Sequence, residues 1–365
     1  MKEMIKTTPA VFAVGDEYQI FVPVKISCLM WVKVGNETYY DDSNGILRSA
    51  SDIHKITVPM EALNEAGKYT VCLRPVVERK PYFSETGEVS EMEFDFFAPK
   101  GSNLKAYEIA DAHNTVGLVL QSYEKFKEEY GRVDFLILNG DVPAHCDKGS
   151  DFDVVFSLIE GVTGGNVPVV FARGNHDTRG TTAEIFENYT PTYNGKTYFT
   201  TKLGDIWMII LDCGEDKDDS NVEYGNTNCF AAFRKRETAF LEKVVSEKEY
   251  EKEGIGLKAV ICHAPFTRKN PAPFDIEEDT YKYWAKLLRE EVKPDIMICG
   301  HTHKLSIDEV GGEKDYFGQP CTVVVGSEIN FKEGKYAGSG FIFENGKIKV
   351  VFSGDEKILN TYEIK

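Results

Sequence analysis

The spacing of hydrophobic and polar residues along the chain changes near residue 100. Before that point, short runs in which apolar and polar residues alternate are separated by segments rich in Gly, Asn, Asp and Pro. The runs cover residues 20–26, 31–34, 56–58, 69–73 and 94–96, with no helix-period stretch of any length between them. Short strands at such spacing predict an antiparallel β-sandwich of the immunoglobulin or fibronectin type.

Beyond residue 104 the pattern is that of an α/β fold. Short apolar runs, rich in β-branched residues and ended by Gly, Asn or Asp, predict buried strands at residues 106–110, 133–138, 167–172, 257–262 and 295–299. Amphipathic stretches with helical spacing lie between most of them, at residues 116–130, 151–160, 237–249 and 278–291. Because strands that alternate with helices need crossover connections, we expect sheets covered by helices.

A composition shift at residues 98–103, which include Pro, Gly and Ser, marks the expected linker between the two patterns. We therefore predict two domains, a β-sandwich at residues 1–99 and an α/β domain at residues 104–365. A chain of 365 residues is long enough for two separate cores.

Histidines gather at the ends of the predicted strands of the second part. Five of the seven lie in four short clusters, and a fifth cluster carries an aspartate. Histidine, aspartate and asparagine supply the mixed nitrogen and oxygen ligands that zinc, manganese and iron accept, and the set is too rich for one ion. Polar groups at the carboxyl ends of strands can share one cavity although they are far apart in sequence. The clusters are Asp111-Ala-His113, Asn139-Gly-Asp141, Gly174-Asn-His176-Asp177, His263-Ala-Pro265 and Gly300-His-Thr-His303.

In their order, these five clusters resemble the pattern of the calcineurin-like metallophosphoesterase superfamily: Asp-x-His, Gly-Asp, Gly-Asn-His-Asp/Glu, a lone His, and Gly-His-x-His. The resemblance implies a four-layer αββα sandwich preceded by the small all-β domain, with a dinuclear site between its two sheets. It implies that His176 stays off the metals and faces the leaving group. The implied ligands are Asp111, His113 and His303 for one ion, and Asn175, His263 and His301 for the other, with Asp141 bridging the two.

The chemistry of these side chains agrees with the implied roles. Two divalent ions can clamp a phosphoryl group and lower the pKa of a bridging water, so that a bridging hydroxide attacks a phosphate mono- or diester in line. The two carboxylate oxygens of Asp141 suit a bridge, and the imidazole of His176 can donate a proton to the departing alkoxide. Asp177 beside it is expected to orient that ring. Taken singly, Asp-x-His and Gly-Asp recur by chance and His263 reads as an ordinary strand-end histidine, whereas all five clusters in order favour a phosphoesterase.

A β-sandwich before this type of domain is similar to the arrangement in purple acid phosphatases. Their first motif lacks the histidine, and their second carries a metal-binding tyrosine three residues after the aspartate. Here His113 is present and Ala144 occupies the tyrosine position. The expected site is therefore of the ordinary Asp-x-His type, and the shared first domain says little about the substrate.

For four further residues the sequence allows two interpretations each, and for a fifth, His54, it gives only a weak indication. His145 either reaches the cleft or is a solvated loop histidine, and His54 is expected at the surface. Arg173 and Arg179, which flank the Gly-Asn-His-Asp cluster, either pair with a phosphate oxygen or face water. Asp212, at the end of the apolar run 206–211, either supports the metal ligands or caps a turn.

Composition narrows the partners and the compartment. A formal net charge of −17 and a pI near 5.0 argue against a nucleic-acid binder. No apolar run is long enough to span a bilayer, and eight scattered cysteines favour free thiols in the cytoplasm, unless a signal peptide has been removed.

The remaining expectations concern the substrate, the cofactors and the specificity. We expect a small phosphate ester or a phosphoprotein as partner and two Mn, Fe or Zn ions as cofactors. We expect the polar loops 212–230 and 267–279 to set the specificity. The alternative is a non-catalytic scaffold of the same fold that binds a protein or a carbohydrate; because only leaving-group protonation needs His176, its presence favours the enzyme.

Overall fold

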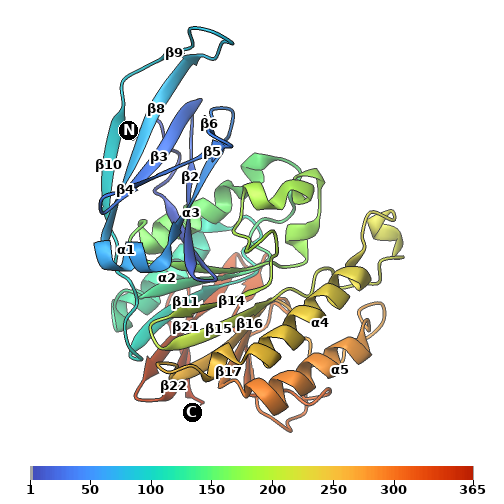
Figure 1. The fold of residues 1–365 in the computed structure, drawn as a ribbon. Helices are drawn as coiled ribbons and strands as arrows, with labels where there is room; N and C mark the ends of the chain where they lie inside the picture. The colour runs from blue at the N-terminus through green and yellow to red at the C-terminus, as the bar shows by residue number, and fades with distance from the viewer. Residues whose placement is uncertain (1–2, 365) are drawn as a thin grey trace.

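The computed structural model describes residues 3–364 and is built on two β-sheets packed face to face (Figure 1). In the first sheet β11, β12, β13 and β1 run parallel, and the other strands pair antiparallel at its two sides. Its order is β23 (Ile358–Glu363), β22 (Lys347–Gly354), β21 (Lys335–Glu344), β11 (Leu104–Ile109), β12 (Phe135–Asn139), β13 (Val169–Ala172), β1 (Ala10–Val14), β2 (Glu17–Pro23) and β7 (Ile53–Pro59), with β20 (Glu328–Asn330) beside β21.

The second sheet contains the other parallel strands. β15, β16, β17 and β19 are parallel, and β14 and β18 close the two edges antiparallel. Its order is β14 (Phe199–Leu203), β15 (Ile206–Leu211), β16 (Leu257–Cys262), β17 (Ile296–Cys299), β19 (Val323–Val325) and β18 (Ser306–Asp308).

The period of two in β15 shows how the layers are held together. Met208 and Ile210 belong to the core between the two sheets, whereas Trp207 and Ile209 belong to a second core beneath helices. All four side chains are nearly inaccessible to solvent. Because successive side chains of a strand point to opposite faces, a strand buried on both sides is apolar throughout.

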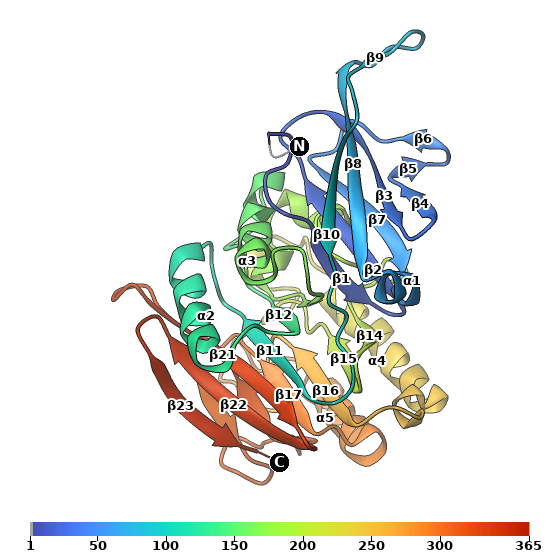
Figure 2. The same ribbon diagram turned by 90° about the vertical axis from the view of Figure 1, so that its left-hand side faces the viewer.

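Helices cover the outer faces and complete the predicted αββα sandwich. α2 (Val116–Tyr130) and α3 (Asp153–Thr163) pack on the first sheet, and α4 (Phe230–Glu247) and α5 (Glu278–Leu287) on the second (Figure 2). The bounds of α2 agree with the sequence-based prediction. α4 begins seven residues earlier than predicted (230 against 237), because the carboxylate of Asp219 accepts hydrogen bonds from the N–H groups of Phe230 and Ala231.

The first hundred residues are β-rich, as expected, and join the rest of the molecule through a shared sheet. β1 pairs with β13, and Tyr69 donates a hydrogen bond to the carbonyl of Gly165 at 2.8 Å. Residues 98–103 have no regular structure, as a linker would, but whether residues 1–99 fold alone stays a prediction. The other strands here are β10 (Ser90–Asp95), β8 (Lys68–Glu78), β3 (Cys28–Val34) and β4 (Glu37–Tyr40) in one sheet, with β9 (Glu85–Thr86) beside β8, and the ribbon of β5 (Asp42–Ser43) and β6 (Ile46–Leu47).

Two features of this region depart from the sequence-based picture. A seven-residue helix, α1 (Met60–Ala66), interrupts the strands and ends at Gly67, whose φ of +63° suits glycine at a helix end. His54, expected at the surface, is fully buried, and its Nδ1 lies 2.5 Å from Asp41 Oδ2. A polar ring can be buried here because a carboxylate thirteen residues away pairs with it.

Within residues 3–364, no helix combines the length and the apolar character needed to cross a bilayer.

Candidate metal centre

The predicted ligands come together between the two sheets, at the carboxyl ends of five parallel strands. Three clusters follow β11, β12 and β13 of the first sheet, and two follow β16 and β17 of the second. The seven side chains are buried or partly buried, and they are called the ligand cluster below. They are Asp111, His113, Asp141, Asn175, His263, His301 and His303.

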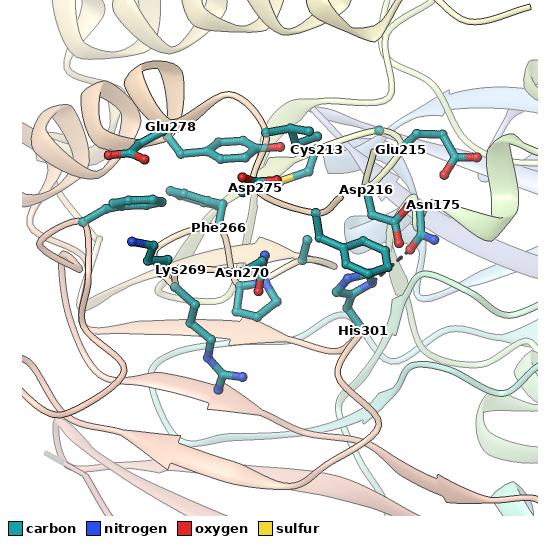
Figure 3. Close-up of a pocket in the computed structure, with 18 residues that line it drawn as sticks. Asn175, Cys213, Glu215, Asp216, Phe266, Lys269, Asn270, Asp275, Glu278 and His301 are labelled. Carbon is teal, nitrogen blue, oxygen red and sulfur yellow. Dashed lines mark hydrogen bonds between the residues drawn. The ribbon is translucent and has the colours of Figure 1, made fainter. Parts of the chain in front are cut away.

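Short distances connect the members of the ligand cluster. His303 Nε2 lies 3.3 Å from Asp111 Oδ1 and 3.1 Å from His113 Nε2. On the other side His263 Nε2 lies 3.3 Å from Asp141 Oδ2. His301 Nδ1 lies 3.0 Å from the side-chain oxygen of Asn175, a contact drawn in Figure 3.

These contacts form two groups that meet at Asp141. Asp111, His113 and His303 can each direct one ligand atom to a common point, and so can Asp141, His263 and His301. Asp141 is also grouped with His113 and His176, so it lies between the two halves.

Electrostatics show that the ligand cluster fits cations. Oδ1 of Asp111 and Nε2 of His263 are buried and have no hydrogen-bond partner among residues 3–364. Burial alone would lower the pKa of His263, yet the carboxylates of Asp141 and Asp111 raise it to about 10. Burial lowers the pKa of His113 to about 4, which leaves its ring neutral, as a metal ligand must be. Without a metal the two carboxylates stabilise a proton on Nε2 of His263, and a divalent ion bound there would displace that proton.

Comparison with known proteins agrees with this geometry. The family model of calcineurin-like phosphoesterases matches residues 104–305, more than half of the chain. The chain belongs to this family. No curated protein matches the sequence significantly. The family is one of metal-dependent phosphoesterases, so membership supports hydrolase activity in general.

One solved structure supports the fold over almost the whole chain. Purple acid phosphatase PPD1 from yellow lupin (Lupinus luteus) seeds superposes with a TM-score of 0.62 at 13% identity, over 98% of this chain and 74% of that one. The protein TT1561 of Thermus thermophilus covers 72% of this chain and 100% of its own at 12% identity, with a TM-score of 0.39. The first of these likenesses extends over the N-terminal β-rich region as well as the phosphoesterase domain.

The backbone at the ligand cluster is strained in a way that points to function. Five of its seven residues, Asp111, His113, Asp141, His301 and His303, have φ between +42° and +70°. The left-handed region costs a residue with a side chain about 1–2 kcal/mol. Such conformations persist where the surrounding structure holds them for a purpose, and here each turn aims a side chain into the cleft.

Close backbone approach explains two of the motif glycines. A Cβ on Gly140 would lie 2.6 Å from the Cα of Gly174 and from Nδ1 of His263. A Cβ on Gly300 would lie 2.8 Å from Oδ2 of Asp111. The glycines therefore let the loops of the phosphoesterase motifs touch one another.

The carboxylate of Asp177, expected to orient the ring of His176, instead accepts hydrogen bonds from the backbone of two other residues. Its Oδ2 accepts hydrogen bonds from the N–H groups of Asp141 at 3.0 Å and Gly174 at 2.7 Å, and its side chain is fully buried. Asp177 therefore ties two ligand-bearing loops together, and the ring of His176 is oriented by another group.

That group is a backbone carbonyl. Nδ1 of His176 lies 2.8 Å from the carbonyl oxygen of Ala144, which only accepts, so Nδ1 carries the proton. Nε2 lies 3.1 Å from Nη1 of Arg179, which only donates, and 4.0 Å from Oδ2 of Asp141. Ala144, where purple acid phosphatases have their tyrosine, thus contributes its main chain to the site.

The two flanking arginines are held by carboxylates. Arg173 Nε lies 2.7 Å from Asp212 Oδ2, and Arg179 forms two contacts of 2.8 Å with Glu215. Asp212 also accepts a hydrogen bond from the N–H of Gly214 at 2.9 Å, which is the turn-capping role. Both arginines therefore pair with carboxylates, and contact of either with a phosphate oxygen stays a prediction.

His145 remains on the surface of the loop that follows Asp141. Its side chain is 56% exposed and lies 3.7 Å from Asp147. This favours the reading as a solvated loop histidine.

Several supporting residues were not predicted. The hydroxyl of Ser327 donates to Oδ2 of Asp111, and the carbonyl of Asn139 accepts from Nδ1 of His263 at 2.6 Å, which turns Nε2 toward the cleft. Phe331 is 62% exposed, with its ring 5.8 Å from that of His113. Ser327 follows β19, so the rule that polar groups gather at strand ends was the available signal.

A pocket of about 200 Å³ opens beside one half of the ligand cluster. Figure 3 shows Asn175 and His301 at one side of it, and Glu278 and Lys269 at the other. Residues from both predicted specificity loops line it, since Cys213 to Asp216 come from one and Arg268 to Glu278 from the other.

Proposed function

We propose that this protein hydrolyses phosphate mono- or diesters with two metal ions held by the ligand cluster. The observation that carries the proposal is the position of Asp141 between two groups of nitrogen and oxygen ligands, each drawn from both sheets, with His263 and His301 on one side of it and His113 on the other. A structural zinc site would instead be closed and rich in cysteine.

The chain supplies a definite set of donors. Asp111, His113 and His303 would hold one ion, His263, His301 and the amide oxygen of Asn175 the other, and Asp141 would bridge them. When bound, two ions at such a site supply Lewis-acid activation of water and charge neutralisation for in-line displacement at phosphorus. The nitrogen and oxygen donors fit Mn, Fe or Zn.

His176 is proposed as the proton donor to the leaving group. Its ring is partly exposed, with a side-chain accessibility of 31%, so substrate can reach it. The Ala144 carbonyl fixes Nδ1–H, so Nε2 would carry the proton for the leaving group, and it would exchange its contact with Arg179 Nη1 for one with the substrate oxygen. General-acid catalysis of this kind contributes about 10²- to 10⁴-fold.

Asp177 has a different part in the proposal. It positions the Asp141 and Asn175 loops through their backbone, and so acts on the geometry of the donors.

The finer assignments also belong to the proposal. The substrate is a small phosphate ester or a phosphoprotein, and the protein works in the cytoplasm. The N-terminal region forms a β-sandwich domain at residues 1–99.

The alternative of a scaffold that binds a protein or a carbohydrate has weaker physical support. A scaffold needs neither a histidine with one fixed tautomer beside the cluster nor left-handed backbone at five ligand positions. The two functions differ in what His176 does.

One experiment separates them. Purified wild-type protein and His176→Ala are compared in metal content and in turnover of p-nitrophenyl phosphate and of an alkyl phosphate. An enzyme loses turnover, most of all for the alkyl ester, and retains its metal. A scaffold shows no metal-dependent turnover in either form.

A further inference from the structure

Phe331 presents an exposed aromatic ring at the edge of the ligand cluster. It lies in the turn 331–334 between β20 and β21 and is 62% exposed. Among residues 3–364, the rings that it approaches are the imidazoles of His113 and His303, at 5.8 and 6.5 Å between centroids. Both histidines belong to the same group of ligands, so a largely solvent-covered apolar ring stands beside the proposed reaction centre.

The hairpin that carries Phe331 is attached to a ligand loop by both of its arms. Just before β20, the hydroxyl of Ser327 donates a hydrogen bond to Oδ2 of Asp111. In β21, the hydroxyl of Tyr336 donates to the carbonyl of Ala110 at 2.8 Å. Both hydroxyl-bearing residues are buried. The ring of Phe331 is therefore held at a set place relative to Asp111.

Hydrogen bonds also close the turn itself. The side-chain oxygen of Asn330 accepts from the N–H groups of Lys332 and Glu333, at 3.1 Å each, in the manner of an Asx turn. Below the turn, β20 and β21 pair in register from residue 328 to residue 337. Because the backbone is already ordered, a ligand that contacts Phe331 has little ordering entropy to offset.

The place of Phe331 relative to the proposed proton donor shows which part of a substrate it would meet. The ring of His113 lies 4.7 Å from that of His176 and 5.8 Å from that of Phe331, so both are neighbours of one imidazole. The oxygen of the leaving group would take its proton from His176. A ring on that leaving group can pair with Phe331, since aromatic rings pair at about 4.5–7 Å between centroids. The pocket described above adjoins the other half of the ligand cluster, at Asn175 and His301.

We propose that Phe331 binds the leaving group, and that the substrates are phosphate esters whose departing alcohol carries an aromatic ring at or next to the ester oxygen; this rests on the proposed function above. Covering Phe331 with such a ring removes apolar surface of both partners from water and adds an aromatic pair. An aliphatic leaving group of the same acidity gains less. Phenolic esters are the simplest members of this class.

The test compares two esters whose leaving groups have similar acidity but differ in aromatic surface. They are 2-naphthyl phosphate and hexafluoroisopropyl phosphate. In metal-loaded full-length Phe331→Ala, kcat/KM for the naphthyl ester should fall by about 3- to 10-fold relative to that for the fluoroalkyl ester, which is the size of one aromatic contact. The loss should appear in KM with kcat little changed, because the ring contacts the leaving group in the ground state as well as in the transition state.

Two further variants serve as controls. Phe331→Tyr keeps the ring and should keep the preference for the naphthyl ester. Phe83→Ala makes the same change of side chain at a 95% exposed position, in the loop between β8 and β9 that projects away from the sandwich (Figure 2), and should leave the preference unchanged. The fluoroalkyl ester is the internal reference for folding in each variant.

The outcomes are distinguishable. Equal losses for the two esters in Phe331→Ala, or a loss of preference in Phe331→Tyr as large as in Phe331→Ala, overturn the inference and leave the hydrolase intact. A higher metal requirement in Phe331→Ala with an unchanged preference also overturns it, because the ring then only supports His113. Absence of turnover of both esters by metal-loaded wild-type protein contradicts the proposed function itself, and this inference with it.

Discussion

Asp177 offers a sharp test of how the site is held together. One buried oxygen accepts hydrogen bonds from the backbone of Asp141, the bridging residue, and of Gly174, which precedes Asn175. Replacing Asp177 by Ala leaves two buried N–H groups without acceptors, whereas Asp177→Asn keeps an acceptor oxygen and removes the charge.

The expected magnitude follows from these two bonds. A buried N–H group left without an acceptor costs about 1–3 kcal/mol, so the free energy of unfolding of Asp177→Ala should fall by about 2–6 kcal/mol. For Asp177→Asn we expect a smaller loss of about 1–3 kcal/mol. Both are large against the total stability of a domain, about 5–15 kcal/mol.

Two assays measure the effect. Urea unfolding of metal-free protein gives the change in free energy, and turnover against metal concentration gives the apparent metal affinity. Because Asp177 acts through the loops, Asp177→Asn should need more metal yet recover most of its turnover at saturation. His176→Ala should keep wild-type stability and stay slow at any metal concentration.

The reasoning is refuted if Asp177→Asn behaves as His176→Ala does. Wild-type stability combined with turnover that saturating metal does not restore would place Asp177 back in the role of orienting the catalytic ring.

Four further predictions concern other residues. His176→Ala should lower turnover of an alkyl phosphate by about 10²- to 10⁴-fold, and that of p-nitrophenyl phosphate by less, since the better leaving group needs no proton; loss of metal from this variant in elemental analysis would contradict the assigned roles. Asp141→Ala should lower the content of both ions, because Asp141 is grouped with His263 and His301 and also with His113, a ligand of the other group, and loss of only one would exclude the bridge. Asp41→Ala leaves the buried ring of His54 without its partner and should reduce the free energy of unfolding by about 1–3 kcal/mol with turnover unchanged, so unaltered stability would count against the buried pair. Burial raises the pKa of Glu237 well above its ordinary value, so the folded state holds that proton more tightly and wild-type stability falls as pH rises from near 5; urea unfolding at pH 5 and 8 should show a smaller fall for Glu237→Gln, and equal falls would refute the assignment.

The sequence was most informative where chemistry and strand ends coincide. The ligands could be named from the resemblance to the phosphoesterase motifs, and their placement in one cavity could be expected because each motif follows an apolar run and parallel strands bring their carboxyl ends to one edge. The bounds of α2 agreed with the prediction, since its amphipathic period is undisturbed.

The misses have a common physical cause, which is a partner remote in sequence. His54 is buried because Asp41 pairs with it, and α4 starts early because the Asp219 carboxylate caps it from eleven residues away. Asp177 was assigned to its neighbour His176, although the loop of Asp141 holds it. In each case the interaction expected from adjacent residues in the sequence differs from the interaction that the folded chain makes.

The pocket was foreseen only in part. The two polar loops could be named from composition, but their charge balance depends on pairs such as Arg179 with Glu215, which join residues 36 positions apart. The local spacing of polar and apolar residues does not show which of these distant charges pair.

The central claim is that two metal ions in the ligand cluster make this protein a phosphoesterase. The most direct test is turnover of p-nitrophenyl phosphate and bis-p-nitrophenyl phosphate by metal-stripped protein resupplied separately with manganese, iron and zinc. The account predicts no turnover in the stripped protein and recovery of at least one activity at about two ions per chain. Protein that holds two ions and hydrolyses neither ester with any of the three metals would contradict it.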